Sequence, residues 1–326
     1  MENLFFNYLN ENDKIKINKI DNHEILGASQ QIKIISNIML NLVDENFDLN
    51  CTKLVEVINS FVNHFIESRG NASRAFINSL RELTRNVNND VDNYEDLKRL
   101  ISNNIKEFKL SAKKNLEKIL EYSNNELSAY TDIFLYDYSS TVEKAVLYIS
   151  EENDRNINIY ISESSAIDGG SPFLKLNDKK NLKIHFFPDS AALYFLKKSQ
   201  CCLMGAETFY PDGTGFNTVG SDIMGYLCKI FDKKLYFLTP MNKLDERRNV
   251  GIRKEIVSID YKDKYKNNDI LDESIFTIIP ELIGVNPDNI YAYITEFGVI
   301  PTNSMYLVSR EYMTRLGGKY EWKTLK

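Results

Sequence analysis

The spacing of apolar residues changes partway along the chain, and this change constrains the fold more than any other feature. Over residues 29–123 apolar residues recur every three or four positions, as at Ile32, Ile35 and Met39, which is the helical period. After Tyr130 they gather into short runs rich in Ile, Phe, Tyr and Leu, each followed by a polar or helical segment. The sequence therefore predicts a helical domain followed by a domain built on strands.

The length of the chain supports the same division. Its 326 residues exceed the roughly 250 that one hydrophobic core usually organises. Hydrophobic residues make up 43% of the chain and charged residues 26%, which is ordinary globular composition. We expect two domains, a helical amino-terminal domain over residues 1–128 and a second domain over residues 129–326.

The second domain alternates strands with helices. Segments 140–150, 190–198 and 221–231 are predicted helices, each opening with Ser. Strands separated by helices indicate a parallel sheet with right-handed crossovers and helices on both faces, so the fold class is α/β. Five runs are the predicted strands: Asp132 to Tyr136, Ile157 to Ser162, Leu182 to Phe187, Cys201 to Met204 and Leu235 to Leu238.

Charge and hydropathy exclude two classes of partner. The net charge is -6 and the Lys residues are interleaved with Asp and Glu, so we expect no direct binding of nucleic acid. The first residues lack a basic start and a long apolar stretch, and no later segment is apolar for the roughly 20 residues of a membrane span. We therefore expect no membrane partner and nothing that targets the chain to a membrane.

The cysteines and histidines give no pattern of metal ligands. Cys51, Cys201, Cys202 and Cys228 have neither the spacing nor the neighbouring His residues of a metal site. We interpret Cys201 and Cys202, which lie in an apolar run, as buried structural thiols, and we expect a reducing, cytoplasmic compartment. Separate surface or packing roles are expected for three residues, His23, His64 and His185. The sequence predicts no metal and no cofactor.

The residues directly after the predicted strands are notably polar. Because ligands of an open parallel sheet bind beyond the carboxyl ends of its strands, carboxylates and hydroxyls there converge on one edge. These residues are Asp137 to Thr141 after the first strand, Ser162 to Ser165 with Gly169 and Gly170 after the second, Asp189 and Ser190 after the third, and Gly205 to Glu207 after the fourth.

Each of these features has two interpretations when taken alone. Ser139 to Thr141 open a helix, where they either favour a phosphate or simply cap the helix. The glycine-rich loop 211–217 with Gly220 matches neither a Walker loop nor the dinucleotide fingerprint. Asp137 and Glu207 are either a general acid and base or ordinary capping and ion-pairing carboxylates.

Several motifs together resemble one known family. They are Leu26-Gly-Ala-Ser29, Arg69-Gly-Asn-Ala-Ser73, Tyr138-Ser-Ser-Thr-Val-Glu-Lys-Ala-Val146, Ile161-Ser-Glu-Ser164, Pro188-Asp-Ser-Ala-Ala192, Gly205-Ala-Glu207, Asn217 with Gly220, and Thr295-Glu-Phe-Gly-Val-Ile-Pro301. In this order they resemble the family that unites the alpha, beta and delta subunits of eukaryotic translation initiation factor 2B with methylthioribose-1-phosphate isomerase and ribose-1,5-bisphosphate isomerase.

The resemblance implies a helical domain followed by a Rossmann-like phosphosugar-binding domain, a homodimer formed through the second domain, and a phosphosugar site in the cleft between the domains. It implies that Asp137 and Glu207 occupy the positions of the catalytic pair. The ligand-binding positions that it implies are Gly27, Ala28, Ser29, Arg69, Gly70, Asn71, Ser73, Tyr138, Ser139, Ser140, Glu163, Ser164, Asp189, Asn217 and Thr218.

The chain departs from the isomerases of this family at four positions. Asp137 stands where they have Cys, and Glu207 stands where they have Asp, as in the initiation factor subunits. Ser165 and Thr218 replace an Arg and a Lys, which removes two cations that pair with a phosphate. In this chain the candidates to supply that charge are Arg69 and Arg74, with Arg247 and Arg248 as further candidates.

Three hypotheses of function follow. The first is binding of a phosphorylated sugar or nucleotide, with aldose–ketose isomerisation by Asp137 and Glu207 if burial raises the pKa of one carboxylate. The second is a non-catalytic subunit that senses such a metabolite and signals to a protein partner. The third is a subunit kept for assembly alone, which predicts no ligand. Because polar residues follow most of the predicted strands, we rank sugar-phosphate binding first.

Overall fold

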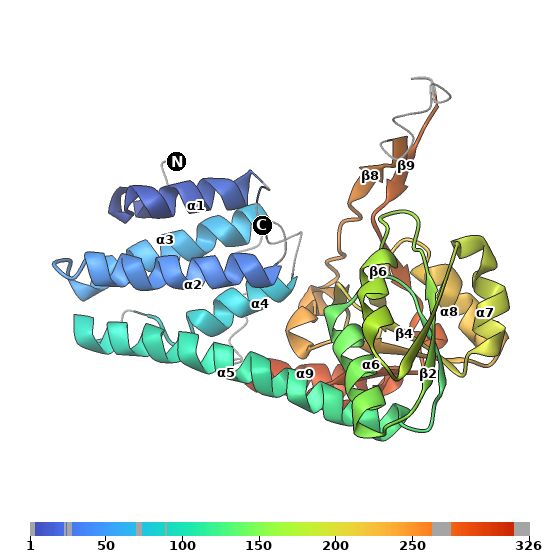
Figure 1. Cartoon of the computed structure of the whole chain (residues 1–326). Coiled ribbons are helices and arrows are strands. Elements are labelled where there is room, and N and C mark those ends of the chain that lie inside the picture. Colours follow the sequence, from blue (N-terminus) through green and yellow to red (C-terminus); the bar gives the residue numbers. More distant parts are fainter. Residues whose placement is uncertain are drawn as a thin grey trace. The chain divides into compact units, whose positions relative to one another are not determined.

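The computed structural model describes residues 4–22, 24, 28–69, 74–88, 90–262 and 275–315, without the side chains of residues 28, 29 and 69. The chain divides into two compact units (Figure 1). Unit 1 comprises Met1–Lys114 together with Arg310–Lys326, and unit 2 comprises Asn115–Ser309.

Unit 1 is helical, as the apolar period predicts. A short 3-10 turn, η1 (Leu4–Tyr8), precedes α1 (Glu11–Asp21), α2 (Ala28–Glu45), α3 (Cys51–Arg69), α4 (Arg74–Leu83) and the first part of the long helix α5 (Tyr94–Leu127). The periodic residues form one core, in which the Phe61 and Phe65 rings pack edge to face. The stripes recognised in the sequence are thus the buried faces of these helices.

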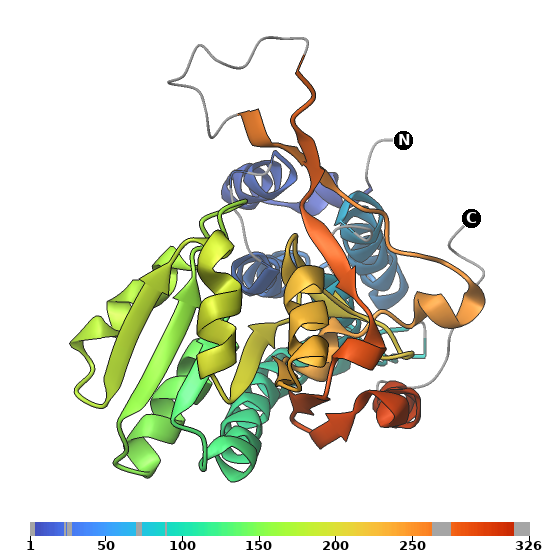
Figure 2. The ribbon, with the colours of Figure 1, turned by 90° about the vertical axis from the view of Figure 1, so that its right-hand side faces the viewer.

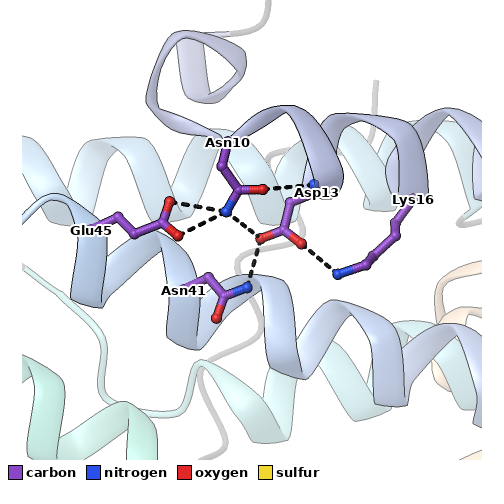
Figure 3. Close-up of polar contacts among 5 residues, drawn as sticks. All are labelled: Asn10, Asp13, Lys16, Asn41 and Glu45. Carbon is purple, nitrogen blue, oxygen red and sulfur yellow. Dashed lines mark hydrogen bonds and ion pairs between the residues drawn. The ribbon is translucent and has the colours of Figure 1, made fainter.

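A polar network ties α1 to α2 within unit 1 (Figure 3). Asn10 caps α1, since its Oδ1 accepts from the Asp13 N–H at 2.9 Å, and its Nδ2 donates to Glu45 at 2.8 Å. The Asp13 carboxylate is fully buried and accepts from Lys16 Nζ and Asn41 Nδ2, each at 2.8 Å. Every charged group of this network is therefore hydrogen-bonded.

Unit 2 is built on a seven-stranded sheet in the order β12-β11-β7-β4-β1-β2-β3. All of its pairs are parallel except that of the edge strand β12 with β11. The α/β prediction and the five predicted strands are confirmed. The strands are β1 (Asp132–Leu135), β2 (Ile157–Ser162), β3 (Leu182–Phe187), β4 (Cys201–Gly205), β7 (Lys234–Leu238), β11 (Ala292–Thr295) and β12 (Gly298–Pro301).

Helices cover both faces of this sheet. Ile133 and Leu135 of β1 share a core with α6 (Ser140–Glu152), whereas Phe134 points the other way and meets Phe187. On that second face Phe187 stacks on Phe195 of α7 (Ala192–Lys198) at 4.0 Å between ring centroids. Beside α7 lies α8 (Ser221–Ile230), and Figure 2 shows the two helices at the front of unit 2.

The prediction of a continuous glycine-rich loop over residues 211–217 was wrong in part. Gly215–Thr218 form a strand, β6, which pairs antiparallel with β5 (Thr208–Phe209) and β10 (Leu282–Val285) in a second, three-stranded sheet. These strands have only two to four residues, and Gly215 and Gly284 lie within them, so none carries an apolar run as long as those of the large sheet.

The rest of unit 2 consists of short elements. The antiparallel strands β8 (Ser258–Asp260) and β9 (Ile278–Pro280) form a third sheet. Short 3-10 turns include η2 (Ser171–Asp178), η3 (Asp189–Ala191), η4 (Met241–Lys243) and η5 (Glu246–Val250). The helix α9 (Met305–Arg315) crosses the division between the units. None of the helices in the described ranges has the length and apolar character that a bilayer span requires.

Candidate functional site

Asp137 lies at the carboxyl end of β1 and is the centre of the candidate site. Its backbone takes the left-handed conformation, with φ 61°, a region in which Asp and Asn are several-fold enriched among non-glycine residues. This conformation occurs in the short link between β1 and α6. Its side chain is only 7% exposed, so a carboxylate is held inside the protein at the end of a central strand.

Three neighbouring segments hold Asp137. The backbone N–H of Asp137 donates to Ser164 Oγ at 2.9 Å, which comes from the loop after β2. Thr218 Oγ1, at the end of β6, donates to Asp137 Oδ2 at 2.8 Å. Gly169 passes so close that a Cβ on it would lie 2.0 Å from Asp137 Oδ1, so only glycine fits there. We call these residues, with Asn217, the Asp137 cluster.

Burial raises the pKa of Asp137 above its ordinary value. Hydrogen bonds from Thr218 and from the Tyr138 N–H act in the opposite direction, as does the nearby Asn217 amide, while the charge of Glu207 raises the pKa further. Because burial is the largest of these effects, Asp137 holds its proton to higher pH than an exposed carboxylate does. This is the property that a proton-donating acid requires.

Asn217 and Glu207 complete the polar surroundings. Asn217 is buried, and its Nδ2 makes no hydrogen bond of good geometry within the described part of the chain. Glu207 is half-buried after β4, where its N–H donates to the Phe216 carbonyl at 2.8 Å. This bond anchors Glu207 beside the strand that carries Asn217 and Thr218.

Asp189, predicted to bind ligand, is occupied by hydrogen bonds within the protein. Its Oδ1 accepts from Ser162 Oγ at 2.5 Å and from the Ser164 N–H at 3.0 Å, and its Oδ2 accepts from the Ser165 N–H at 2.8 Å. Asp189 thereby fixes the loop that brings Ser164 to Asp137. Its observed role is to position that loop.

The side chains of Ser139 and Tyr138 also form hydrogen bonds within the protein. Ser139 caps α6, since its Oγ accepts from the Val142 N–H at 3.4 Å, and Ser140 is the first residue of that helix. The Tyr138 hydroxyl donates to Glu143 at 2.6 Å, and burial followed by this bond raises its pKa. Of the predicted side chains after β1, Asp137 is thus the one that joins the cluster.

The residues predicted in unit 1 fall largely outside the described part of the chain. Gly27, Gly70, Asn71 and Ser73 are not described, nor are the side chains of Ala28, Ser29 and Arg69. Arg74 opens α4 and is buried.

The further Arg candidates of unit 2 lie against carboxylates. Arg247 pairs with the buried Asp245 at 2.9 Å, and Arg248 lies 3.5 Å from Asp212. Both guanidinium groups therefore have carboxylate partners within unit 2.

Sequence reasoning passed over Tyr136, the buried residue directly before Asp137. Its hydroxyl donates to the Val219 carbonyl at 2.9 Å, and burial followed by the charge of Asp189 raises its pKa. Gly220 has φ 96°, and a Cβ on it would lie 2.0 Å from the Tyr136 hydroxyl oxygen. The sequence signal for this contact is the isolated glycine directly before the Ser that opens α8.

The histidines have separate structural roles, as predicted, where they are described. His64 Nε2 lies 2.9 Å from Asp21 Oδ2 in unit 1, and His185 stacks on Tyr160 in unit 2. His23 lies outside the described residues. No three His, Cys, Asp or Glu side chains gather as metal ligands in the ranges that the structure covers.

Comparison with known proteins finds relatives that are named isomerases and solved structures that are named isomerases or initiation factor subunits. The protein named ribose 1,5-bisphosphate isomerase of Methanocaldococcus jannaschii is 22% identical over 93% of this chain and 97% of its own length. The protein of the same name from Archaeoglobus fulgidus is 24% identical, and the match spans 57% of this chain but only 59% of that relative.

Solved structures share the fold. The 5-methylthioribose 1-phosphate isomerase of Pyrococcus horikoshii matches with a TM-score of 0.71 at 14% identity, over 92% of this chain and 87% of that chain. The translation initiation factor eIF-2B of the same organism matches with a TM-score of 0.68 at 15% identity, over 90% and 98%. A sequence model of the initiation factor 2 subunit family matches residues 26–302, and the chain therefore belongs to the initiation factor 2 subunit family.

Proposed function

We propose that this protein binds a phosphorylated sugar at the carboxyl edge of the large sheet of unit 2 and interconverts its aldose and ketose forms. Membership of the family and the relatives named ribose 1,5-bisphosphate isomerase support the class of ligand. The observation that carries the reaction is the buried Asp137, whose pKa burial raises at the end of β1.

In the proposed reaction the two carboxylates exchange protons with the sugar. In ribose 1,5-bisphosphate C1 carries a phosphate, so protonated Asp137 gives its proton to the ring oxygen as the bond from that oxygen to C1 breaks, while Glu207 removes the proton from C2 and an enediol phosphate forms between C1 and C2. Glu207 then returns the proton to C1, and Asp137 takes the proton of the C2 hydroxyl, which leaves the C2 ketone. Each carboxyl group ends as it began, so the isomerisation needs no further reactant.

Solvent exchange tests this proposal. The purified protein is incubated with ribose 1,5-bisphosphate in D₂O, and NMR follows both ketose formation and the entry of deuterium at carbon. We expect deuterium-labelled product from the wild type and a much slower appearance of both product and label with Asp137→Asn. Asp212→Asn changes an exposed carboxylate of the same unit and serves as the control that retains activity.

The outcomes separate the hypotheses. Saturable binding without exchange in the wild type rejects catalysis and favours a metabolite-sensing subunit. No binding of ribose 1,5-bisphosphate, ribose 5-phosphate or a nucleoside monophosphate rejects the sugar-phosphate proposal and leaves an assembly role.

We also propose a homodimer formed through α8. This helix packs on the sheet through Met224 and Cys228, yet Ile223, Tyr226 and Ile230 on its outer side are 56%, 54% and 69% exposed. A helix that is apolar on both sides is normally buried on both sides. On α7, the neighbouring helix at the front of unit 2 in Figure 2, Leu193 and Tyr194 are exposed as well, and they extend the apolar surface of α8.

The charges on α8 favour a second copy as the partner. Asp222 in the first turn and Lys229 in the last lie seven residues apart, so they project from the same edge of the helix. In an antiparallel pair of α8 helices related by a two-fold axis, each Asp222 meets the Lys229 of the other copy. The outer side of α8 is therefore complementary in charge to the same side of α8 in a second copy.

Charge exchange tests the dimer. Asp222→Lys and Lys229→Asp should each produce monomers in sedimentation experiments, and the double variant should restore the dimer. Leu307→Asp, at an exposed apolar position of α9, is the control. A monomeric wild type, or single variants that remain dimeric, would reject the α8 interface.

We propose that the protein is located in a reducing, cytoplasmic compartment because of the state of its cysteine thiols. Cys51, Cys201, Cys202 and Cys228 are all free. Burial raises the pKa of Cys201 and Cys202, which keeps these thiols protonated and unreactive. Localisation of a tagged chain by microscopy tests this, and secretion of the tagged protein would contradict it.

A further inference from the structure

Tyr136 connects the two segments that hold Asp137. Its hydroxyl donates to the Val219 carbonyl at 2.9 Å. Val219 directly follows Thr218, whose hydroxyl donates to Asp137 Oδ2 at 2.8 Å. On the other side, Ser164 Oγ accepts from the Asp137 N–H at 2.9 Å, and the Ser164 hydroxyl also lies within hydrogen-bonding reach of Tyr136. The contacts therefore form a closed cycle that begins and ends at Asp137.

The side chains of this cycle are shielded from water. Tyr136, Ser164 and Thr218 are all buried, so water does not readily replace a hydrogen bond that is lost there. Burial and then the charge of Asp189 raise the pKa of Tyr136, as does the charge of Asp222, whereas the contact with Ser164 lowers it. Because burial is the largest of these effects, Tyr136 keeps its proton and remains a hydrogen-bond donor.

The link from β6 to α8 is held from two sides. It consists of Val219 and Gly220. On one side the Val219 N–H donates to the Glu281 carbonyl, directly before β10, at 3.1 Å. On the other side the Tyr136 hydroxyl lies against Gly220, where a Cβ would come within 2.0 Å of its oxygen. The position of this link fixes Thr218, the residue before it.

We propose that Tyr136 is a positioning residue, which acts on Asp137 through Thr218 by keeping the Thr218 hydroxyl directed at the carboxylate. Loss of the Tyr136 hydroxyl removes a donor from the Val219 carbonyl and loosens the link that follows Thr218. A weaker bond from Thr218 stabilises the charged form of Asp137 less, so Asp137 holds its proton to higher pH. The charge of Glu207, which also raises the pKa of Asp137, is unchanged by this loss.

A titration of the protein without ligand tests this proposal. Carbon-13 NMR of labelled aspartate carboxyl groups follows Asp137, whose signal is identified by its absence from Asp137→Asn. Tyr136→Phe removes the hydroxyl and keeps the aromatic ring, and the titration midpoint of Asp137 should move to higher pH. The matched control is Tyr293→Phe, because Tyr293 is also buried and its hydroxyl donates to the Gly213 carbonyl at 3.0 Å, before the start of β6. This control should lower the melting temperature to a similar extent and leave the midpoint in place.

A double variant shows whether Tyr136 acts through Thr218. Thr218→Val alone should move the midpoint to higher pH, because it removes the hydrogen bond to Asp137. Adding Tyr136→Phe should move it no further, since the bond that Tyr136 keeps in place is already absent. A folded Tyr136→Phe protein with the wild-type midpoint, or a double variant whose shift is the sum of the two single shifts, would overturn the proposal.

The consequence for turnover rests on the proposed function. In the isomerisation of ribose 1,5-bisphosphate, Tyr136→Phe should lower kcat by less than about tenfold and leave KM within about twofold, because Tyr136 acts on the reaction through Asp137. The basic limb of the pH–rate profile should move to higher pH. A wild type without turnover whose midpoint responds as expected would reject the proposed function and retain the positioning role. An active wild type whose midpoint is the same in Tyr136→Phe would reject the positioning role alone.

Discussion

Units 1 and 2 each bury an aspartate, and the two carboxylates have different surroundings. Asp13 in unit 1 is fully buried and accepts from the Lys16 ammonium and from the amides of Asn10 and Asn41 (Figure 3). Asp137 in unit 2 is 7% exposed and accepts from the neutral hydroxyl of Thr218, and no ion pair within the described residues includes it.

The difference lies in the cation. A buried carboxylate that meets an ammonium and two amides is compensated, and it holds α1 on α2. A buried carboxylate with neutral partners is not fully compensated, and burial raises its pKa. An incompletely compensated buried carboxylate lowers stability, and proteins usually retain such a group where it takes part in binding or catalysis. The comparison assigns a structural role to Asp13 and, under the proposed function, a chemical role to Asp137.

The largest effect is expected from removing the acid. Asp137→Asn keeps the size of the side chain and an oxygen that accepts from Thr218, but it has no acidic proton to give. Isomerisation of ribose 1,5-bisphosphate, followed by NMR, should slow by about 10²- to 10⁴-fold. The control is Asp13→Asn, which should keep turnover per folded molecule. Equal losses of turnover in both variants would contradict the different roles assigned to Asp13 and Asp137.

The next effect concerns stability. Asp13→Ala leaves the Lys16 ammonium and the Asn41 amide without their acceptor, so urea denaturation should show a loss of roughly 3 kcal/mol in the free energy of unfolding of unit 1. Lys16 is partly exposed and recovers water, which holds the loss at the lower end of the range for buried pairs. A loss below about 1 kcal/mol would mean that the network of Figure 3 is not structural.

The sequence predicts one of these aspartates as a site residue and is silent on the other. Asp137 follows a strand run directly, and the ends of parallel strands meet at one edge, so its position alone indicated a site. Asp13 stands in the polar segment Glu11-Asn-Asp-Lys14, which reads like an exposed first turn of a helix. Its burial depends on Asn41, 28 residues further on, a contact that no local pattern encodes.

Contacts between residues far apart in the sequence also explain the other features that the sequence did not predict. The parallel sheet was predictable because its strands are apolar runs, whereas β5 and β6 are short and are specified by their pairing with each other and with β10. The convergence of Ser164, Gly169 and Thr218 on Asp137 arises from tertiary contacts between loops of different strands.

A smaller effect should appear in the pH dependence of stability. The pKa of Asp137 is higher in the folded state than its ordinary value of 3.8, so between these two values the folded protein binds more protons than the unfolded protein. Stability therefore falls as pH rises through this window. Asp137→Asn has no titrating group at this position, so its stability does not fall in this window. Its melting temperature should therefore exceed that of the wild type by a few degrees at neutral pH. Calorimetry should find no difference well below pH 3.8.

The smallest effect is expected from Thr218→Val, which preserves volume and removes the hydrogen bond to Asp137. That bond favours the carboxylate and lowers its pKa, so its loss raises the pKa of Asp137 further. The basic limb of the pH–rate profile, where the protonated acid disappears, should move to higher pH, while the maximal rate changes by less than about tenfold. Thr84→Val, which removes a hydroxyl bonded to the Leu80 carbonyl in unit 1, is the control and should leave the profile unchanged. A limb that stays in place in Thr218→Val would show that the group titrating in the reaction is not Asp137, and would move the search for the acid to Glu207.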